Sequence, residues 1–306
     1  TGNNMDMSPL LPPKYKSCKY NKYHFSTDEN GNIRFKAVGK SINFYSVGME
    51  KARENLKNVI NDIYKNIGEI EFDSAFIGCS ALDNEASNET ITALCDGVIR
   101  AKKIGMNSDV YVALASSGED KCRIVAICGT GSIVTGIDEN CNIKTKGGWG
   151  HIFGDEGSAY SIAVNALKAS AMLYDEGNIT PLVKKAEEFF GVEDLRTAID
   201  KIYSPETTKD ILAGFSTKVG EIAEEDFVAK TVIVNEAHFF SKTVLALLNE
   251  MKNCTLLSLY GGVFQNNELF RKSFIDDIKE FHSDLKIEML TLPPEEGALK
   301  IAREMQ

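Results

Sequence analysis

The chain has 306 residues, which is enough for two domains of ordinary size that each bury their own core. Apolar residues make up 43% of the sequence and charged residues 25%, as is typical of globular proteins. The net charge of −10 argues against nucleic acid or an anionic membrane as the main partner, and no apolar run reaches the roughly 20 residues that a membrane-spanning helix needs.

The cysteines and histidines indicate neither a disulfide framework nor a metal site. The seven cysteines are scattered without a Cys-x-x-Cys spacing, and the four histidines are isolated from one another. The polar, proline-bearing start lacks the apolar region of a secretory signal. These features favour reduced thiols in a cytoplasmic protein, with no zinc ligands.

The first third of the chain predicts a hairpin followed by alternating helices and strands. Asp28-Glu29-Asn30-Gly31-Asn32 is typical of a tight turn, and residues 33–38 of a strand. Apolar residues at helical spacing predict a helix from about Gly48 to Ile67. A strand over Phe72–Cys79 and a helix over Glu89–Lys102 follow.

A glycine-bearing turn follows a buried strand near the middle of the chain. Cys122–Cys128 is apolar and β-prone, and it leads directly into Gly129-Thr130-Gly131-Ser132. Because two glycines leave backbone N–H groups unobstructed, and the two hydroxyls add donors, this turn can hold phosphate oxygens. Strands over 133–137 and 143–146, joined by a turn at 138–142, come next.

A second glycine-rich segment leads into a helix. It contains Gly147-Gly148-Trp149-Gly150, with the only tryptophan, and then Gly154-Asp155-Glu156-Gly157-Ser158. Apolar residues at helical spacing begin at Ala159. The acidic turn therefore lies at a helix start, where backbone N–H groups lack partners.

The rest of the chain is mainly helical. Thr180-Pro181 and Ser204-Pro205 each predict a helix start, and Asp226–Lys252 predicts one long helix. A buried strand, Leu256–Tyr260, ends at Gly261-Gly262. The last expected elements are a helix over 265–281, a strand over 287–292 and a helix over 295–305. Interleaved strands and helices predict an α/β fold with mostly parallel sheets.

An internal repeat supports a two-domain organisation. The segment beginning at Asp28 and the one beginning at Asp138 share an Asp-Glu-Asn-x-Asn-Ile pattern, 110 residues apart. Both are expected to be hairpin turns that feed a third strand. One α/β domain in each half, with a cleft between the two, would account for the duplication.

The ordered series of motifs at 129–132, 147–151 and 154–160 resembles the N-acetylglucosamine kinase family. That family lies in the actin/hexokinase/Hsp70-like ATPase fold group and is related to the activator ATPases of benzoyl-CoA reductases and dehydratases. The resemblance implies two RNase H-like, actin-like ATPase domains, the second enriched in helices. It also implies ATP with Mg²⁺ bound between the domains and an amino sugar beneath the γ-phosphate.

The resemblance implies a role for individual residues. Asp109 matches the general base, although by itself it is more typical of a helix cap. The residues implied to contact the sugar are Asn43, Gly148, Trp149 and Asp155. Those implied to contact ATP are Gly129, Thr130, Gly131 and Ser132 at the phosphates and Gly261, Gly262 and Val263 at the adenine. No protein group is assigned as a direct metal ligand.

Domain boundaries follow from the same resemblance and from the proline pair. Pro293-Pro294 is expected to mark a crossing of the chain between domains, since proline ends one element and redirects the chain. The first domain is then expected to comprise residues 1–117 and 293–306, and the second residues 118–292. A homodimer is a further expectation.

The amino-terminal segment departs from the family pattern. Where related kinases carry an acidic, glycine-rich phosphate turn, this chain has Cys18-Lys19-Tyr20-Asn21-Lys22, and Pro12-Pro13 precedes it in place of an apolar strand. Two alternatives to the kinase therefore stay open. One is a non-catalytic sugar-binding or regulatory homologue, and the other is an ATPase of the dehydratase-activator type. The choice among N-acetylglucosamine, N-acetylmuramic acid and glucosamine is also open.

Overall fold

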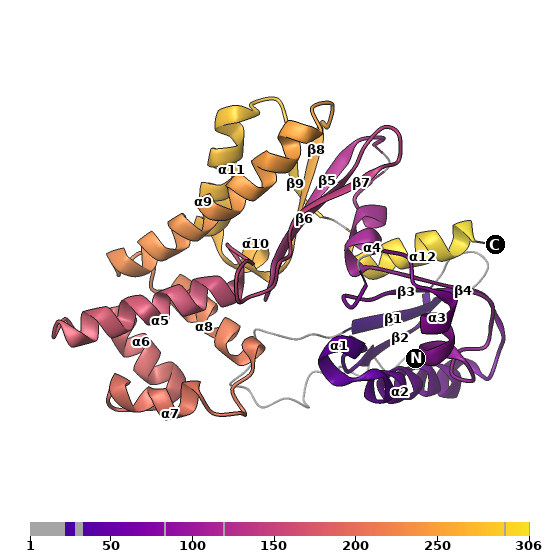
Figure 1. The fold of residues 1–306 in the computed structure, drawn as a ribbon, viewed down its shortest axis with the longest axis horizontal. Coiled ribbons are helices and arrows are strands. Elements are labelled where there is room, and N and C mark those ends of the chain that lie inside the picture. Colours follow the sequence, from indigo (N-terminus) through magenta and orange to yellow (C-terminus); the bar gives the residue numbers. More distant parts are fainter. Residues whose placement is uncertain (1–21, 28–32, 83, 119, 291, 306) are drawn as a thin grey trace, which may run out of the picture. The chain divides into compact units, whose positions relative to one another are not determined.

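The computed structural model describes residues 22–27, 33–82, 84–118, 120–290 and 292–305. They divide into two compact units. The larger unit is formed by Ala126–Met289, and the smaller unit by residues 22–125 together with 290–305. The chain thus leaves the smaller unit and returns to it after the larger one (Figure 1).

The smaller unit begins with an antiparallel hairpin of β1 (Lys22–Thr27) and β2 (Ile33–Gly39). The expected turn at 28–32 lies outside the described residues. β3 (Phe72–Gly78) and β4 (Ala101–Asn107) form a parallel pair. The helices of this unit are α1 (Phe44–Val47), α2 (Met49–Ile67), α3 (Asn88–Cys95), α4 (Asp109–Ser116) and α12 (Pro294–Glu304).

The prediction of one helix over 89–102 is wrong in its second half. Helix α3 ends at Cys95, and Gly97 takes a left-handed conformation (φ 64°) just before the chain turns into β4. Exposed Lys102 and Lys103 lie within this strand, which pairs only with β3 among the described residues. Because β4 lacks the apolar run of a buried strand, its composition resembles that of a helix surface.

Helix α12 packs against α4 of the smaller unit (Figure 1). The two helices approach closely at Gly297, where an added Cβ would lie 2.1 Å from the Val112 carbonyl oxygen. Ser74 of β3 also donates a hydrogen bond to the carbonyl oxygen of Ala302 (2.6 Å). Any side chain at position 297 would therefore push the two helices apart.

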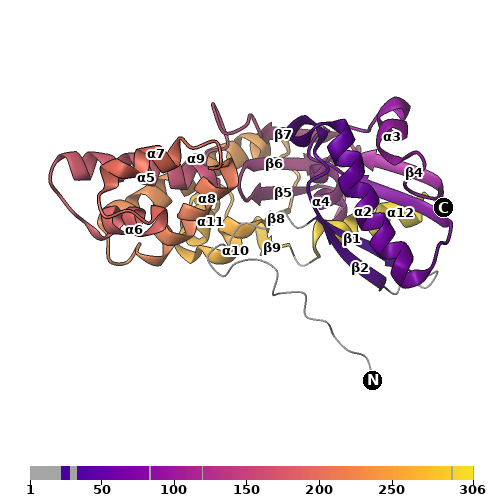
Figure 2. The same cartoon turned by 90° about the horizontal axis from the view of Figure 1, so that it is seen from below.

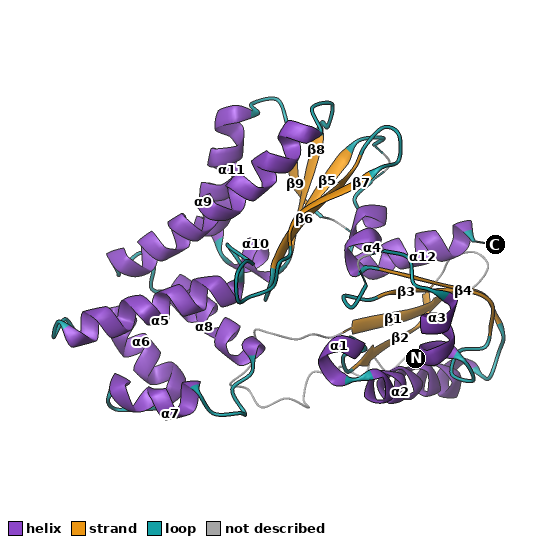
Figure 3. Ribbon diagram, in the orientation of Figure 1, coloured by secondary structure: helices purple, strands orange, loops and turns teal. Residues whose placement is uncertain are grey.

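The larger unit is built on a five-stranded sheet with the order β7-β6-β5-β8-β9 (Figure 3). β6 and β7 pair antiparallel, whereas β8 and β9 pair parallel, so the expectation of mostly parallel sheets holds only in part. The strands are β5 (Arg123–Cys128), β6 (Ser132–Ile137), β7 (Ile143–Gly147), β8 (Leu256–Tyr260) and β9 (Lys286–Met289). The expected mixed α/β fold is confirmed.

Figure 2 shows most helices of the larger unit to the left of the strands of its sheet. They are α5 (Ala159–Asp175), α6 (Pro181–Phe190), α7 (Ala198–Ile202), α8 (Lys209–Glu221), α9 (Phe227–Glu250), α10 (Gly262–Asn266) and α11 (Glu268–Phe281). The start expected at Ser204-Pro205 is wrong, because α8 begins after Thr208, whose hydroxyl accepts from the Ile211 N–H. The single helix expected over 265–281 is instead α10 and α11, which meet at Asn267.

Helices α9 and α11 lie side by side and enclose an aromatic core. Phe240 of α9, Phe264 of α10, and Phe270 and Phe274 of α11 are all buried, and the rings of Phe264 and Phe274 meet edge to face at 5.0 Å. Such pairs add to the stabilisation that burial alone provides. Phe227 is exposed because it is the first residue of α9 and lies beyond this core.

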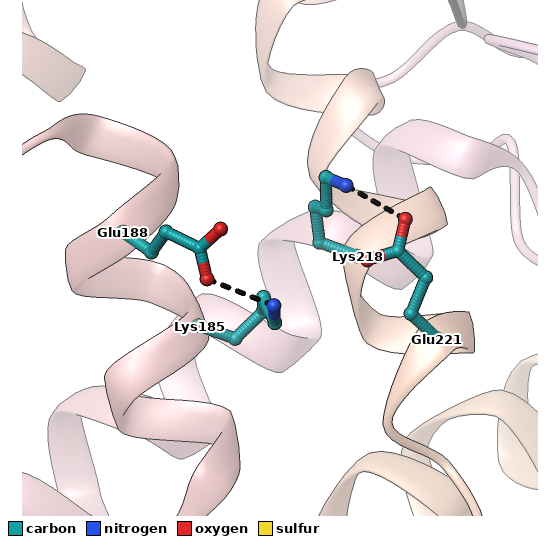
Figure 4. Close-up of polar contacts among 4 residues, drawn as sticks. All are labelled: Lys185, Glu188, Lys218 and Glu221. Carbon is teal, nitrogen blue, oxygen red and sulfur yellow. Dashed lines mark hydrogen bonds and ion pairs between the residues drawn. The ribbon is translucent and has the colours of Figure 1, made fainter.

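Helices α6 and α8 pack together, and each carries an ion pair. Lys185 pairs with Glu188 at 2.8 Å, and Lys218 pairs with Glu221 at 2.6 Å, each within one helix (Figure 4). The hydrogen bond to Glu188 raises the pKa of Lys185. Glu188 and Glu221 are exposed and Lys185 and Lys218 are partly buried, and ion pairs at such positions contribute little to stability.

The expectation that the cysteines are reduced thiols holds only in part. Among the described residues, Cys79, Cys95, Cys128 and Cys141 are free thiols. Cys122 and Cys254 are each disulfide-bonded, so the expectation of reduced thiols is wrong at these two positions. Across the described part of the chain, no helix combines the length and the apolar character needed to cross a membrane.

Candidate functional site

The turn Gly129–Ser132 joins the carboxyl end of β5 to the start of β6. The Gly129 N–H donates to the carbonyl oxygen of Gly131 (2.9 Å), which closes the turn on itself. Thr130 and Ser132 are both buried. The sequence thus forms a tight connection at a strand end, the position at which α/β sheets commonly bind ligands.

The acidic turn 154–158 is hydrogen-bonded to the turn at 129–132. The Ala159 N–H donates to the Gly129 carbonyl oxygen (2.8 Å), and the Ser132 hydroxyl donates to the Glu156 carbonyl oxygen (2.7 Å). The two motifs, separate in the sequence, therefore form one structural unit. Because the Ser132 hydroxyl hydrogen is used in this contact, its proposed role at phosphate would need a rearrangement.

Asp155 places its carboxylate against the phosphate-type turn. Its backbone is left-handed (φ 62°), and the residue is only 5% exposed. A Cβ added at Gly131 would lie 2.8 Å from Asp155 Oδ2, so only glycine leaves room for the acid there. Lys209 Nζ, from the first turn of α8, lies 3.0 Å from the same oxygen. The buried negative charge is thereby paired.

The peptide of Gly157 is held from two sides. Its N–H donates to Glu236 Oε2 of α9 (2.7 Å), and its carbonyl oxygen accepts from the Cys128 thiol (3.0 Å). Gly157 has a φ of 80°, and an added Cβ would lie 2.6 Å from the Cβ of Phe240. Glycine is therefore required here for both its backbone conformation and its size.

Burial raises the pKa of the Cys128 thiol well above its usual range, and the carboxylates of Glu236 and Asp155 raise it further. Cys128 therefore stays protonated and acts as a hydrogen-bond donor. A reactive thiolate is not expected at this position.

The loop that carries Trp149 exposes an apolar surface. Gly148 N–H donates to the Ser132 carbonyl oxygen (3.1 Å), which ties the loop to β6. Trp149 is 68% exposed, and its ring lies 6.2 Å from that of the exposed Phe153. An exposed aromatic face next to buried polar groups is suited to the apolar face of a small ligand.

Gly261 brings the end of β8 against the end of β5. Its φ is 112°, and an added Cβ would lie 2.3 Å from the Cys128 carbonyl oxygen. Helix α10 begins directly afterwards at Gly262, and Val263 is buried within it. Within the larger unit, the structure thus gathers three of the sequence-predicted segments around Cys128: 129–132, 154–158 and 261–263.

The smaller unit holds the two remaining candidates at one edge of its parallel strand pair. Gly78 of β3 and Asn107 of β4 are register partners at the carboxyl ends of these strands. Asn43 Nδ2 donates to the Ser80 hydroxyl (3.0 Å), just beyond the end of β3. Asp109 begins α4, just beyond the end of β4.

Local roles at this edge differ for the two candidates. Asn43 Oδ1 caps α1 by accepting from Tyr45 and Ser46 N–H groups, so only its amide hydrogens are directed elsewhere. Ser108 caps α4 through the Tyr111 N–H, which leaves Asp109 as the first residue inside the helix. The exposed Asp109 side chain thus lies where negative charge is favoured at a helix start.

The residues present fit a nucleotide better than a directly bound metal. Gly129 of the turn has open space where a Cβ would lie, whereas the space beside Gly131 holds the Asp155 carboxylate. Among the described residues, no group of three or more His, Cys, Asp or Glu side chains could hold a metal ion. Mg²⁺ would then be held largely through phosphate oxygens and water, as is common at nucleotide sites.

Sequence reasoning missed Lys209 and Glu236, which hold the acidic turn in place. Lys209 is 54 residues from Asp155, and Glu236 is 79 residues from Gly157. Neither lies in a motif, and a lysine or glutamate on a helix is usually a surface residue. The one available signal was Glu236 itself, a charged residue within the apolar stripe of α9.

Comparison with known proteins identifies the family. A model of the BadF/BadG/BcrA/BcrD ATPase family matches residues 25–299, and the chain belongs to this family. The match includes the turn at 129–132, the acidic turn and Asp109.

Similar proteins include two kinases. The chain is 29% identical over 262 residues to an N-acetylmuramic acid/N-acetylglucosamine kinase of Clostridium acetobutylicum, covering 82% of this chain and 86% of that protein. It is 24% identical over 299 residues to an N-acetyl-D-glucosamine kinase of Dictyostelium discoideum, covering 90% and 92%. The resemblance to amino-sugar kinases predicted from the motifs is confirmed.

A solved structure shares the fold. It comes from Chromobacterium violaceum, is described as a candidate N-acetylglucosamine kinase, and matches with a TM-score of 0.71 at 18% identity. The match covers 90% of this chain and 92% of that one.

Proposed function

We propose that this protein is an ATP-dependent kinase that transfers the γ-phosphoryl group to a hydroxyl of an amino sugar such as N-acetylglucosamine. The observation that carries the proposal is the joining of the turn at 129–132 to the acidic turn, which buries the Asp155 carboxylate beside Gly131. Membership in an ATPase family and the similarity to two amino-sugar kinases support it.

The proposal assigns the nucleotide to the glycine-bearing segments of the larger unit. In the turn Gly129–Ser132, the Gly129 N–H closes the turn on Gly131, and the remaining backbone N–H groups would bind phosphate oxygens, with the Thr130 hydroxyl as a further donor. Gly261, Gly262 and Val263 would border the adenine. ATP supplies the phosphoryl group, and Mg²⁺ neutralises part of the phosphate charge.

The sugar would be recognised by one carboxylate, one amide and one aromatic face. Asp155 accepts hydrogen bonds from sugar hydroxyls, and the Asn43 amide donates to a sugar oxygen. Trp149 and the neighbouring Gly148 would contact the ring, whose C–H face packs well on an aromatic side chain. Buried polar groups of this kind discriminate strongly against ligands that lack the matching hydroxyl.

Asp109 is proposed as the general base. Its carboxylate would accept the proton of the attacking hydroxyl as the bond to phosphorus forms. The proposal therefore requires Asp109 and Asn43 from the smaller unit as well as the residues of the larger one. It treats the two units as the halves of an actin-like ATPase.

One alternative is favoured by a specific observation, the departure from the family pattern at residues 18–22. Of these residues, 18–21 lie outside the described ranges. A homologue without the first phosphate turn would bind sugar and fail to bind nucleotide. Rigid N–H donors to phosphate contribute about 1.5–3 kcal/mol each, so we expect ATP to bind more weakly than N-acetylglucosamine even in an active enzyme.

Separate calorimetric titrations with N-acetylglucosamine and with ATP plus Mg²⁺ distinguish the kinase from the non-catalytic homologue. The kinase proposal predicts heat of binding for both ligands, with the smaller affinity for ATP. Sugar binding without any nucleotide binding would select the non-catalytic homologue, and failure to bind the sugar would contradict both.

A further inference from the structure

A lysine outside every recognised motif is joined to the acidic turn. Lys209 Nζ lies 3.0 Å from Asp155 Oδ2, and it also lies 5.8 Å from the ring centre of Tyr160. The Tyr160 ring packs edge-on against His151 at 4.9 Å. The ammonium group is thus held by a buried carboxylate and by an aromatic face, which also attracts cations.

The position of Lys209 in its own helix does not explain this arrangement. It is the first residue of α8, directly after the cap Thr208. A positive charge at a helix start is unfavourable, because backbone N–H groups already point there. Its side chain is also only 29% exposed, although a lysine is normally solvated. The compensating interaction is the pairing with Asp155, whose side chain is 6% exposed.

The ion pair between Lys209 and Asp155 offsets an unfavourable charge within the proposed site. A carboxylate next to a phosphate-binding turn repels the phosphates unless a cation neutralises it. The same carboxylate must keep a fixed orientation to bind a sugar hydroxyl. Lys209 contacts Oδ2, the oxygen nearer to Gly131, which leaves Oδ1 for the ligand.

We propose that Lys209 is a positioning residue for the sugar site: it fixes the Asp155 carboxylate so that Oδ1 faces the amino sugar, and it shields the phosphates from the carboxylate's charge. This inference rests on the proposed function, because it assigns Asp155 to the sugar. Lys209 acts through Asp155 and does not itself take part in phosphoryl transfer.

The test uses three single variants of the full chain. Lys209→Met removes the charge and keeps the apolar stem, and Lys209→Arg keeps the charge. Lys218→Met is the matched control, because Lys218 lies on the same helix and pairs with Glu221 on the surface. Binding of N-acetylglucosamine is measured by calorimetry, and the thermal unfolding midpoint is measured for each variant.

Lys209→Met is expected to weaken sugar binding about 10- to 10²-fold, the loss that follows when one hydrogen bond to a charged group is no longer made. Lys209→Arg should retain most of the affinity for N-acetylglucosamine, and Lys218→Met should bind the sugar as tightly as the unchanged protein. Equal sugar affinity of Lys209→Met and Lys218→Met would overturn the inference. If the unchanged protein itself fails to bind the sugar, the proposed function is at fault.

A double variant separates positioning from a general structural role. In protein that already carries Asp155→Asn, Lys209→Met should cause little further loss of sugar affinity, since its partner carboxylate is gone. This comparison also serves if Lys209→Met alone fails to fold, because the double variant leaves no buried charge unpaired. A further loss as large as in the single variant would contradict positioning through Asp155.

Discussion

At the scale of single residues, the site depends on side chains whose backbone and neighbours leave little freedom. Asp155 has a left-handed backbone, a buried carboxylate and a cation on one oxygen. Asp109, in contrast, is exposed at the start of α4. These environments suit different tasks: a fixed acceptor for ligand recognition and an accessible carboxylate for proton transfer.

Asp109→Asn is expected to abolish sugar phosphorylation and to leave sugar binding nearly unchanged. The amide keeps the shape of the carboxylate but cannot accept the proton, and the loss of a general base typically lowers the rate about 10²–10⁴-fold. Turnover and the sugar dissociation constant are measured on the same preparation. A variant that retains near-full turnover would remove Asp109 from the mechanism.

The free thiols should differ sharply in reactivity. Burial raises the pKa of Cys95 to about 11, so only about one thiol in 10³ is ionised near pH 8. Burial raises the pKa of Cys128 as well, whereas Cys141 is exposed. Alkylation of the native protein followed by peptide mass spectrometry should modify Cys141 first, and Cys95 and Cys128 only after unfolding. Rapid modification of Cys128 in the native protein would contradict its assigned role as a buried donor.

At the scale of secondary structure, Asp226 connects two helices of the larger unit. Its Oδ1 accepts from the Val228 and Ala229 N–H groups at the start of α9, and its Oδ2 accepts from the Leu182 N–H in the first turn of α6. Burial alone would raise the pKa of Asp226, but the hydrogen bonds that its carboxylate accepts, led by those from the Ala229 and Leu182 N–H groups, together outweigh burial and lower the pKa.

Asp226→Asn should therefore destabilise the fold in a pH-dependent way. Loss of a helix cap typically costs about 0.5–2 kcal/mol, and asparagine retains part of the capping. Since the folded-state pKa is lowered, the contribution of the charge is fully present near neutral pH. It begins to fall below about pH 4, the ordinary pKa of aspartate, and is lost as the pH passes through the lower pKa of the folded state.

Urea unfolding of Asp226→Asn at neutral and acidic pH measures this difference. Asp200→Asn, at an exposed position of α7, serves as the control and should change stability little at either pH. A stability difference for Asp226→Asn that is as large below pH 4 as at neutral pH would show that the charge is not responsible.

The sequence predicts best the helices and strands whose buried apolar residues recur at a regular spacing. Helix α2 buries Ala52, Leu56, Val59, Ile60 and Ile63 at helical spacing, and its bounds match the expected ones within a residue. β4 was missed because an edge strand with exposed lysines has no such pattern. The contacts of Lys209 and Glu236 could not be predicted, since they depend on how α8 and α9 pack against the acidic turn.

At the scale of the whole molecule, the described residues form two units, and the candidate residues are distributed over both. Each unit presents its candidates at the carboxyl ends of strands, β5 and β8 in one and β3 and β4 in the other. Such strand ends are the usual ligand-binding positions of α/β sheets.

The most direct measurement of the central claim is the formation of a phosphorylated amino sugar. The protein is incubated with N-acetylglucosamine, Mg²⁺ and increasing ATP up to millimolar concentration, and the products are identified by mass spectrometry. We expect a sugar phosphate whose formation requires both substrates and whose rate still rises with ATP in the millimolar range. ATP hydrolysis that is independent of sugar, or the absence of any sugar phosphate at every ATP concentration, would contradict it.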